Sequence, residues 1–210
     1  SALKYKAFGT SSIMFGDDAT GTIDAANYNT GLGVDVFAAL TTGDENVAIG
    51  AMSLAATTTG QYNTGVGKGS LEANTTGTYN VAIGANALQT ATTASDNTAV
   101  GYYALQAATT GHSNTVVGKE AGKVLTTGAE NVFVGERAGD AATTGGNNTG
   151  VGHKALSSLT TASSNEAFGN DALQALTTGT NNVAVGSFAL DALTDASYHV
   201  GVGYQALSAN

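Results

Sequence analysis

A repeat with a 17-residue period, free of insertions and deletions, constrains the fold of this chain more than any other feature of its sequence. The unit 97–113 reads NTAVGYYALQAATTGHS, and steps of one period lead from it to an equivalent point in every other unit. A glycine follows each of twelve such anchor points by four positions, from Gly16 to Gly203. A fixed period of this kind predicts a solenoid, in which every unit forms one coil stacked on the next.

We number the positions of a unit from 1 to 17, starting at the anchor residue. Position 1 is Ser12 in the first unit, His199 in the last and asparagine in all units between them. These asparagines are Asn29, Asn46, Asn63, Asn80, Asn97, Asn114, Asn131, Asn148, Asn165 and Asn182. An amide that recurs at one point of every coil can both donate to and accept from its neighbours, so we predict a structural ladder of side-chain amides.

The other columns predict an all-β fold, a β-solenoid (β-roll) of about 12 coils with a 17-residue period. Positions 1 to 4 are rich in Val, Thr and Ile, as in a short strand, and the glycine at position 5 indicates a corner. Thr-Thr-Gly at positions 13 to 15 indicates a second corner. Positions 6 to 12, as in 170–176 (NDALQAL), also allow one helical turn per coil. At about 4.8 Å per rung, the coils would form a rod about 55–60 Å long.

The repeat covers the whole chain, which predicts a single repeat domain over residues 1–210. Residues 1–11 would form a partial N-terminal coil, residues 12–198 eleven full repeats and residues 199–210 a partial C-terminal coil. Neither end resembles a polar capping repeat. We therefore expect at least one end to continue in a longer protein, to dock on another domain or to stack on another copy.

Composition disfavours several classes of partner. The chain has 7 Lys and Arg against 16 Asp and Glu, a net charge of −9, which is unsuited to nucleic acid. It has no apolar run long enough to cross a bilayer, so we predict no membrane span. It also lacks cysteine, which removes disulfides and thiolate metal sites, and the lack of proline suits a chain whose backbone N–H groups form ladders.

The residues with catalytic or metal-binding chemistry are scattered over different columns. His112, His153 and His199 occupy positions 16, 6 and 1, and no two of them share a coil. Two acidic pairs, Asp17-Asp18 and Asp44-Glu45, could offer oxygen ligands to calcium, but solvated corners explain them better. We therefore predict a protein that is not an enzyme, with no catalytic residues, no cofactor and no metal site.

Two surface columns suggest binding. Tyrosines recur at two variable sets of positions, where exposed rings could stack on a glycan, although covering neighbouring corners explains them better. They are Tyr28, Tyr62, Tyr79 and Tyr198 at position 17, and Tyr102, Tyr103 and Tyr204 at positions 6 and 7. Of these, Tyr102 and Tyr103 are the pair that we name as the candidate glycan contact. Thr-Thr at positions 13 and 14 recurs in nine units, and regular threonine ladders are a feature of ice-binding solenoids. Adjacent residues of a strand point to opposite faces, however, so a two-column threonine face would need a T-x-T pattern.

Units of the form NTAVGYxAL…TTGxxNTAVG resemble repeats of phage tail-fibre and tail-spike proteins and of large bacterial surface proteins. The segments 46–50 and 80–84, which read NVAIG, also resemble more loosely the head repeats of trimeric autotransporter adhesins. The latter resemblance implies a left-handed β-roll packed about a threefold axis. The 17-residue period with its added Thr-Thr-Gly corner is longer than the usual head repeat, and the resemblance transfers no site residue.

The function that we expect is a non-enzymatic structural or adhesive rod, a segment of a viral tail fibre or bacterial surface fibre located outside the cell, on the cell surface or on the virion. One alternative is an extracellular filament subunit that stacks head to tail, and another is an ice-binding solenoid that uses its threonine ladders. The partners that we expect are copies of the same chain, as a trimer or a head-to-tail polymer, and a cell-surface glycan. If the chain forms a trimer, small residues at position 3, such as Ala48, Ala82 and Ala99, are where close approach to a partner chain is easiest.

Overall fold

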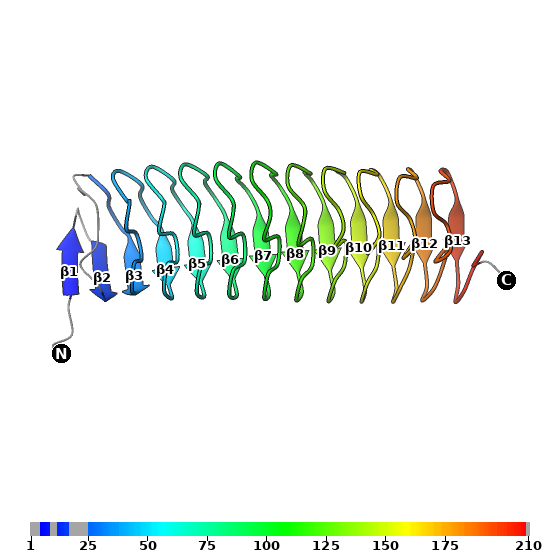
Figure 1. Cartoon of the computed structure of the whole chain (residues 1–210), viewed down its shortest axis with the longest axis horizontal. Coiled ribbons are helices and arrows are strands. Elements are labelled where there is room, and N and C mark those ends of the chain that lie inside the picture. Colours follow the sequence, from blue (N-terminus) through cyan, green and yellow to red (C-terminus); the bar gives the residue numbers. More distant parts are fainter. Residues whose placement is uncertain (1–4, 9–11, 17–24, 209–210) are drawn as a thin grey trace.

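The computed structural model describes residues 5–8, 12–16 and 25–208 and confirms the β-solenoid with its 17-residue period (Figure 1). Coils of nearly identical outline stack along a straight axis, with one strand in each coil and the strands side by side in a single sheet (Figure 1). Within the described residues there is no helix, and positions 6 to 12 form turns instead of the helical turn that their sequence pattern allowed.

The sheet contains thirteen strands within the described residues, in sequence order. The strands are β1 (Tyr5–Phe8), β2 (Ser12–Gly16), β3 (Thr30–Gly33), β4 (Val47–Ile49), β5 (Thr64–Val66), β6 (Val81–Ile83), β7 (Thr98–Val100), β8 (Thr115–Val117), β9 (Val132–Val134), β10 (Thr149–Val151), β11 (Glu166–Phe168), β12 (Val183–Val185) and β13 (Val200–Val202). From β2 onward, each strand pairs in parallel with the next, and residues one period apart lie opposite each other, as do Val47 and Thr64.

The first strand departs from the repeat. The period places residues 1–11 in a partial coil, but β1 pairs antiparallel with β2, and Tyr5 lies opposite Phe15. This strand therefore lies along the edge of β2 and engages backbone groups that an uncovered sheet edge would expose. Residues 1–4, 9–11 and 209–210, which the period also assigned to partial coils, lie outside the described residues.

One coil, residues 46–62, serves to name the parts of all the others. Asn46 is followed by strand β4, the glycine corner (50–53), the return segment (54–57) and the threonine corner (58–62). Backbone hydrogen bonds join each part to the next coil: Val47 N to Asn63 O (2.8 Å), Leu54 N to Ser70 O (3.0 Å) and Thr58 N to Thr75 O (2.9 Å). The coils are thus fastened to one another around most of their circumference.

Left-handed backbone conformations explain why the return segment begins in turns and not in a helix. The residues at positions 7, 9 and 17 have positive φ in almost every described coil, for example 59° at Met52, 53° at Leu54 and 57° at Tyr62. Such residues interrupt a right-handed helix. The conformational free energy that they cost is offset by the packing of the coil, whose corners must close within a few residues. At position 5, Gly67 has a φ of 132°, and an added Cβ would lie 2.6 Å from the carbonyl carbon of Gly84. Only glycine fits there.

The core is a narrow space between the strand and the return segment. Positions 1, 3, 8, 9, 12 and 15 point into it; in the coil 80–96 they hold Asn80, Ala82, Ala87, Leu88, Ala91 and Ala94, all fully buried. The prediction that position 3 meets a partner chain is wrong, because Ala48, Ala82 and Ala99 are fully buried inside their own coils. Strand residues alternate between the two faces, so positions 2 and 4 point outward instead.

Candidate functional site

The asparagines of position 1 form a continuous ladder inside the solenoid. The Nδ2 of Asn114 donates to Oδ1 of Asn97 and to the carbonyl of Gly128, both at 3.0 Å. Its own Oδ1 accepts from the backbone N–H and from Nδ2 of Asn131, again at 3.0 Å. All ten of these asparagines are buried, and their amides are engaged as hydrogen-bond donors and acceptors within the coil stack. The ladder is therefore structural and offers no group to a ligand.

His199 takes the place of an asparagine in the last described coil. Its backbone N–H donates to Oδ1 of Asn182 at 3.0 Å, which continues the backbone half of the ladder. The imidazole does not replace the side-chain half, because its buried Nδ1 makes no hydrogen bond. The histidine thus ends the column of side-chain amides.

The threonine corner contains a second ladder, made of hydroxyl groups. The first threonine of each pair is half-buried, and its Oγ1 donates to the carbonyl of the equivalent threonine in the next coil, as from Thr126 to Thr143 at 3.0 Å. The second threonine, such as Thr127, is exposed. One of the two threonine columns is thus occupied with holding coils together, and this corner presents a single exposed threonine column.

Tyr102 and Tyr103 lie together on the glycine corner. Their ring centroids are 4.0 Å apart with the planes inclined at 50°, and Nζ of Lys123 lies 5.2 Å from the centroid of the Tyr103 ring. Tyr102 is exposed and Tyr103 is half-buried. A hydrogen bond between the two side chains raises the pKa of Tyr102 and lowers that of Tyr103, and a further hydrogen bond from Asn86 adds to the lowering. The pair offers an aromatic surface with a cation and polar groups beside it.

A second tyrosine pair lies on the threonine corner, at position 17. Tyr62 and Tyr79 stack with their ring centroids 5.0 Å apart and their planes within 3° of parallel. Both rings are exposed, and the pKa of Tyr62 is raised chiefly by the carboxylate of Glu45 on the preceding coil. The sequence placed both tyrosines in the column of position 17, and their stack follows because residues one period apart occupy neighbouring rungs.

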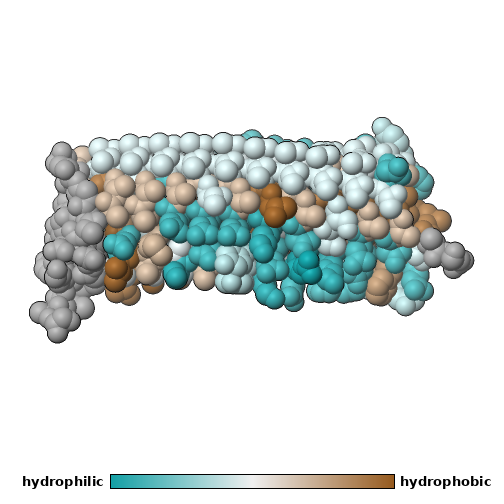
Figure 2. Space-filling view, viewed as in Figure 1, coloured by the Kyte–Doolittle hydropathy of each residue, from teal (hydrophilic) through white to brown (hydrophobic). Residues whose placement is uncertain are grey.

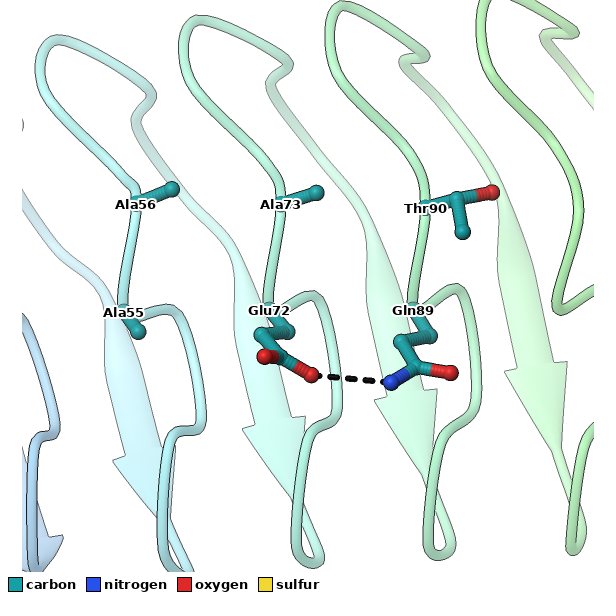
Figure 3. A pocket seen from close by; sticks show the side chains of 6 residues that line it. All are labelled: Ala55, Ala56, Glu72, Ala73, Gln89 and Thr90. Carbon is teal, nitrogen blue, oxygen red and sulfur yellow. Dashed lines mark hydrogen bonds between the residues drawn. The ribbon is translucent and has the colours of Figure 1, made fainter.

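The return segment carries a polar row and a shallow hollow. Nε2 of Gln89 donates to Oε2 of Glu72, and Nε2 of Gln106 donates to Oε1 of Gln89, both at 2.9 Å. Figure 3 shows Glu72 and Gln89 one coil apart, next to the small side chains of Ala55 and Ala73 that line the hollow. Figure 2 shows hydrophilic side chains forming a band along the middle of this face. The hollow is open and carries no convergent set of reactive groups.

The histidines and acidic residues that the sequence offered as catalytic or metal-binding candidates do not lie close together. His112 bonds to the neighbouring Ser113, and His153 bonds to Asn170 on the next coil. Asp44 accepts the backbone N–H of Asn27 at 2.7 Å, whereas Asp17 and Asp18 lie outside the described residues. In the part of the chain that the structure describes, no three His, Asp or Glu side chains lie close enough to hold a metal ion. The same part contains no helix that is long and apolar enough to cross a membrane.

Charge is distributed unevenly around the coil. All Lys and Arg side chains of residues 25–208 lie on the glycine corner or at the start of the return segment: Lys68, Lys119, Lys123, Arg137 and Lys154. Three of them form ion pairs: Lys119 with Glu136, Lys123 with Glu120 and Arg137 with Asp140. The threonine corner of the same residues carries acids, such as Glu45, Asp96 and Glu130, and no cation. The glycine corner is thus the side of the rod with the more varied chemistry.

Comparison with known proteins adds no relative: no family model, no curated protein and no solved structure matches this chain.

Proposed function

We propose that this chain is a non-enzymatic structural rod with an adhesive corner, a segment of a viral tail fibre or of a bacterial surface fibre that works outside the cell. One observation carries the proposal: a buried amide ladder runs without interruption from Asn29 to Asn182. The same coil structure therefore repeats along the rod. An interior of this kind supplies length and stiffness, and leaves only the corner and outward-facing positions free to vary. The sequence resemblance to fibre repeats supports the same role.

Two other functions receive less support from the contacts of the coils. The ice-binding alternative relies on two exposed threonine columns, but the first column is half-buried and its hydroxyl groups bind the next coil. The head-to-tail filament relies on ends that continue the parallel stack of coils, but the first strand of the sheet is β1, which runs antiparallel to β2. We therefore keep the structural and adhesive rod as the single proposal.

The adhesive part of the proposal is placed at Tyr102 and Tyr103, with a cell-surface glycan as the ligand. The faces of aromatic rings pack against the apolar C–H faces of sugars, and the tyrosine hydroxyl groups, Asn86 and Lys123 supply polar partners at the rim. A tilted pair of rings on a rigid corner needs little reorganisation on binding, which favours weak ligands presented in many copies.

A glycan array tests this assignment. The wild-type chain is expected to give a signal on a subset of glycans, and the double substitution Tyr102→Ala with Tyr103→Ala is expected to abolish it. The matched control is Tyr62→Ala with Tyr79→Ala, which removes two exposed tyrosines of the other corner and should retain the signal. Retention of binding by the first variant, or its loss in the control alone, would place the adhesive site elsewhere.

A further inference from the structure

The outward face of the sheet is a nearly uncharged stripe on an acidic protein. We call it the strand face and define it by the side chains at positions 2 and 4. Position 2 holds Thr30, Val47, Thr64, Val81, Thr98, Thr115, Val132, Thr149, Glu166, Val183 and Val200. Position 4 holds Leu32, Ile49, Val66, Ile83, Val100, Val117, Val134, Val151, Phe168, Val185 and Val202. Glu166 is the one charged side chain in these two columns.

Six of the eleven side chains at position 4 are exposed, and the other five, Val66, Val100, Val117, Val134 and Val151, are half-buried. Leu32 is 51% exposed, Ile49 37% and Ile83 41%, while the small residues between the two columns are buried in the core. Isolated exposed aliphatic residues are ordinary, but a column of aliphatic residues that are exposed or half-exposed on every rung of a sheet marks an interaction surface. Most of the side chains are β-branched and therefore stiff, so the face is ordered before it meets a partner.

We infer that the strand face is the surface through which two copies of this chain pair side by side, with their coils in register. The inference is independent of what the rod adheres to. A second copy is the partner whose rungs repeat at the same spacing over the full length of the stripe. Side chains that protrude at intervals of about 4.8 Å can then fit between those of the partner on every rung, whereas a surface of another period would lose register.

The area of the strand face is sufficient for such a pair. Eleven rungs at about 4.8 Å and a width of three strand residues give about 500 Å² for each copy and about 1,000 Å² for the pair. A specific interface needs about 1,000 Å² in total, and side chains of the flanking corners would add to this area. The pair therefore lies at the lower bound of stable interfaces before the corners are counted.

The charges beside the strand face select the relative orientation of the two rods. In the ten coils of residues 29–198, the glycine corner carries four cations and four acids, whereas the threonine corner carries five acids and no cation. A twofold axis parallel to the rods places the threonine corner of each copy against the glycine corner of the other. The antiparallel arrangement would place the acidic threonine corners against each other. Charge complementarity thus favours parallel rods.

Native mass measured by sedimentation tests the inference on the full chain. The wild type is expected to have twice the mass of the 20.7 kDa chain at micromolar concentration. In the variant Ile49→Lys with Ile83→Lys, pairing would bury lysines without partners, so we expect dissociation to be favoured by at least about 100-fold. The matched control is Ala56→Lys with Thr90→Lys, which adds the same charge to the open hollow of the return segment in the same coils, away from the strand face and both corners, and should remain paired.

The remaining outcomes overturn the inference. A monomeric wild type would exclude pairing, a threefold or open-ended mass would exclude the twofold arrangement, and a pair that survives both lysines of the strand face would place the interface elsewhere. Circular dichroism checks that each variant is folded. Should the lysine variant unfold, Ile49→Thr with Ile83→Thr takes its place, because threonine already occupies strand-face positions such as Thr64 and is expected to weaken the pair without disturbing the coil.

Discussion

Two neighbouring pairs of coils fill the same space with different residues. In the coils that begin at Asn80 and Asn97, position 3 is alanine and position 9 is leucine. In the coils that begin at Asn114 and Asn131, position 3 is Val116 or Phe133 and position 9 is glycine. All these side chains are buried, and the strands of the four coils pair in unbroken register.

The exchange shows that neighbouring coils together fill the core, although the position that supplies the large side chain differs. An added Cβ at Gly139 would lie 2.6 Å from Cζ of Phe133, so the ring occupies the space that a leucine at position 9 fills in other coils. At Gly122, an added Cβ would lie 3.4 Å from Cγ1 of Val116 and Cδ2 of Phe133. The amide ladder, in contrast, keeps asparagine in all four coils, because its hydrogen bonds depend on one chemical group.

Removal of the ring is expected to have the largest effect. Phe133→Ala should lower the free energy of unfolding by about 4 kcal/mol, because it leaves a cavity beside a glycine. Phe133→Ala with Gly139→Leu recreates the pattern of Ala99 and Leu105 and should recover more than half of that loss. Chemical denaturation measures both. A double variant that is no more stable than Phe133→Ala would refute the exchange of volume between the two positions.

Interruption of the amide ladder in the same region should have the next largest effect. Asn114→Ala leaves the carbonyl of Gly128 and the backbone N–H of Asn131 without these side-chain partners in a buried site. At about 1–3 kcal/mol for each unsatisfied group, a loss of about 3 kcal/mol is expected. The control Asn170→Ala, at a corner position, should cost less than about 0.5 kcal/mol. Equal costs for the two substitutions would contradict the structural role of the ladder.

The hydroxyl ladder of the threonine corner should be weaker. Thr126→Val removes one hydrogen bond to the carbonyl of Thr143 and keeps the shape of the side chain, so a loss of about 1 kcal/mol is expected. Thr127→Val, at the exposed neighbouring position, should be close to neutral in the same denaturation experiment. The reverse order of the two effects would show that the exposed column holds the coils together.

The smallest effect concerns the tyrosines at the boundary between the two pairs of coils. The hydrogen bond from Tyr102 is the main cause of the lowered pKa of Tyr103, because it stabilises the phenolate. Tyr102→Phe should therefore raise the pKa of Tyr103 toward its ordinary value, so that Tyr103 ionises at higher pH than in the wild type. Ultraviolet titration of the phenolate measures this shift, and an unchanged titration of Tyr103 would exclude the hydrogen bond as its cause.

The sequence predicted those features that depend on periodicity. The 17-residue period indicated the parallel rungs and the corners at position 5 and at Thr-Thr-Gly, and the column of asparagines indicated an amide ladder. The sequence did not predict which strand residues point into the core, because small residues at position 3 are as suitable for a crowded core as for close contact with a partner chain. The left-handed residues at Met52 and Leu54 were also unforeseen, since propensity alone allows a helical turn there.

The tyrosine pairs illustrate the same limit for the candidate site. The sequence placed Tyr62 and Tyr79 in one column and singled out Tyr102 and Tyr103 for a glycan. It did not predict that Tyr62 stacks on Tyr79, which requires the period to be read as a distance in space. The antiparallel strand β1 was not foreseen either, because residues 5–8 also fit the phase of the repeat. Phase along a chain does not determine the direction in which an edge strand pairs.

Small-angle X-ray scattering of the wild-type chain in dilute solution tests the central claim most directly, since it yields the length of a rod and its mass per unit length. We predict a rod about 55–60 Å long whose mass per unit length is twice that of a single stack of coils. A mass per unit length equal to that of a single stack would contradict side-by-side pairing. A rod of the predicted length would then be a monomer, and a longer rod would be an end-to-end stack of chains.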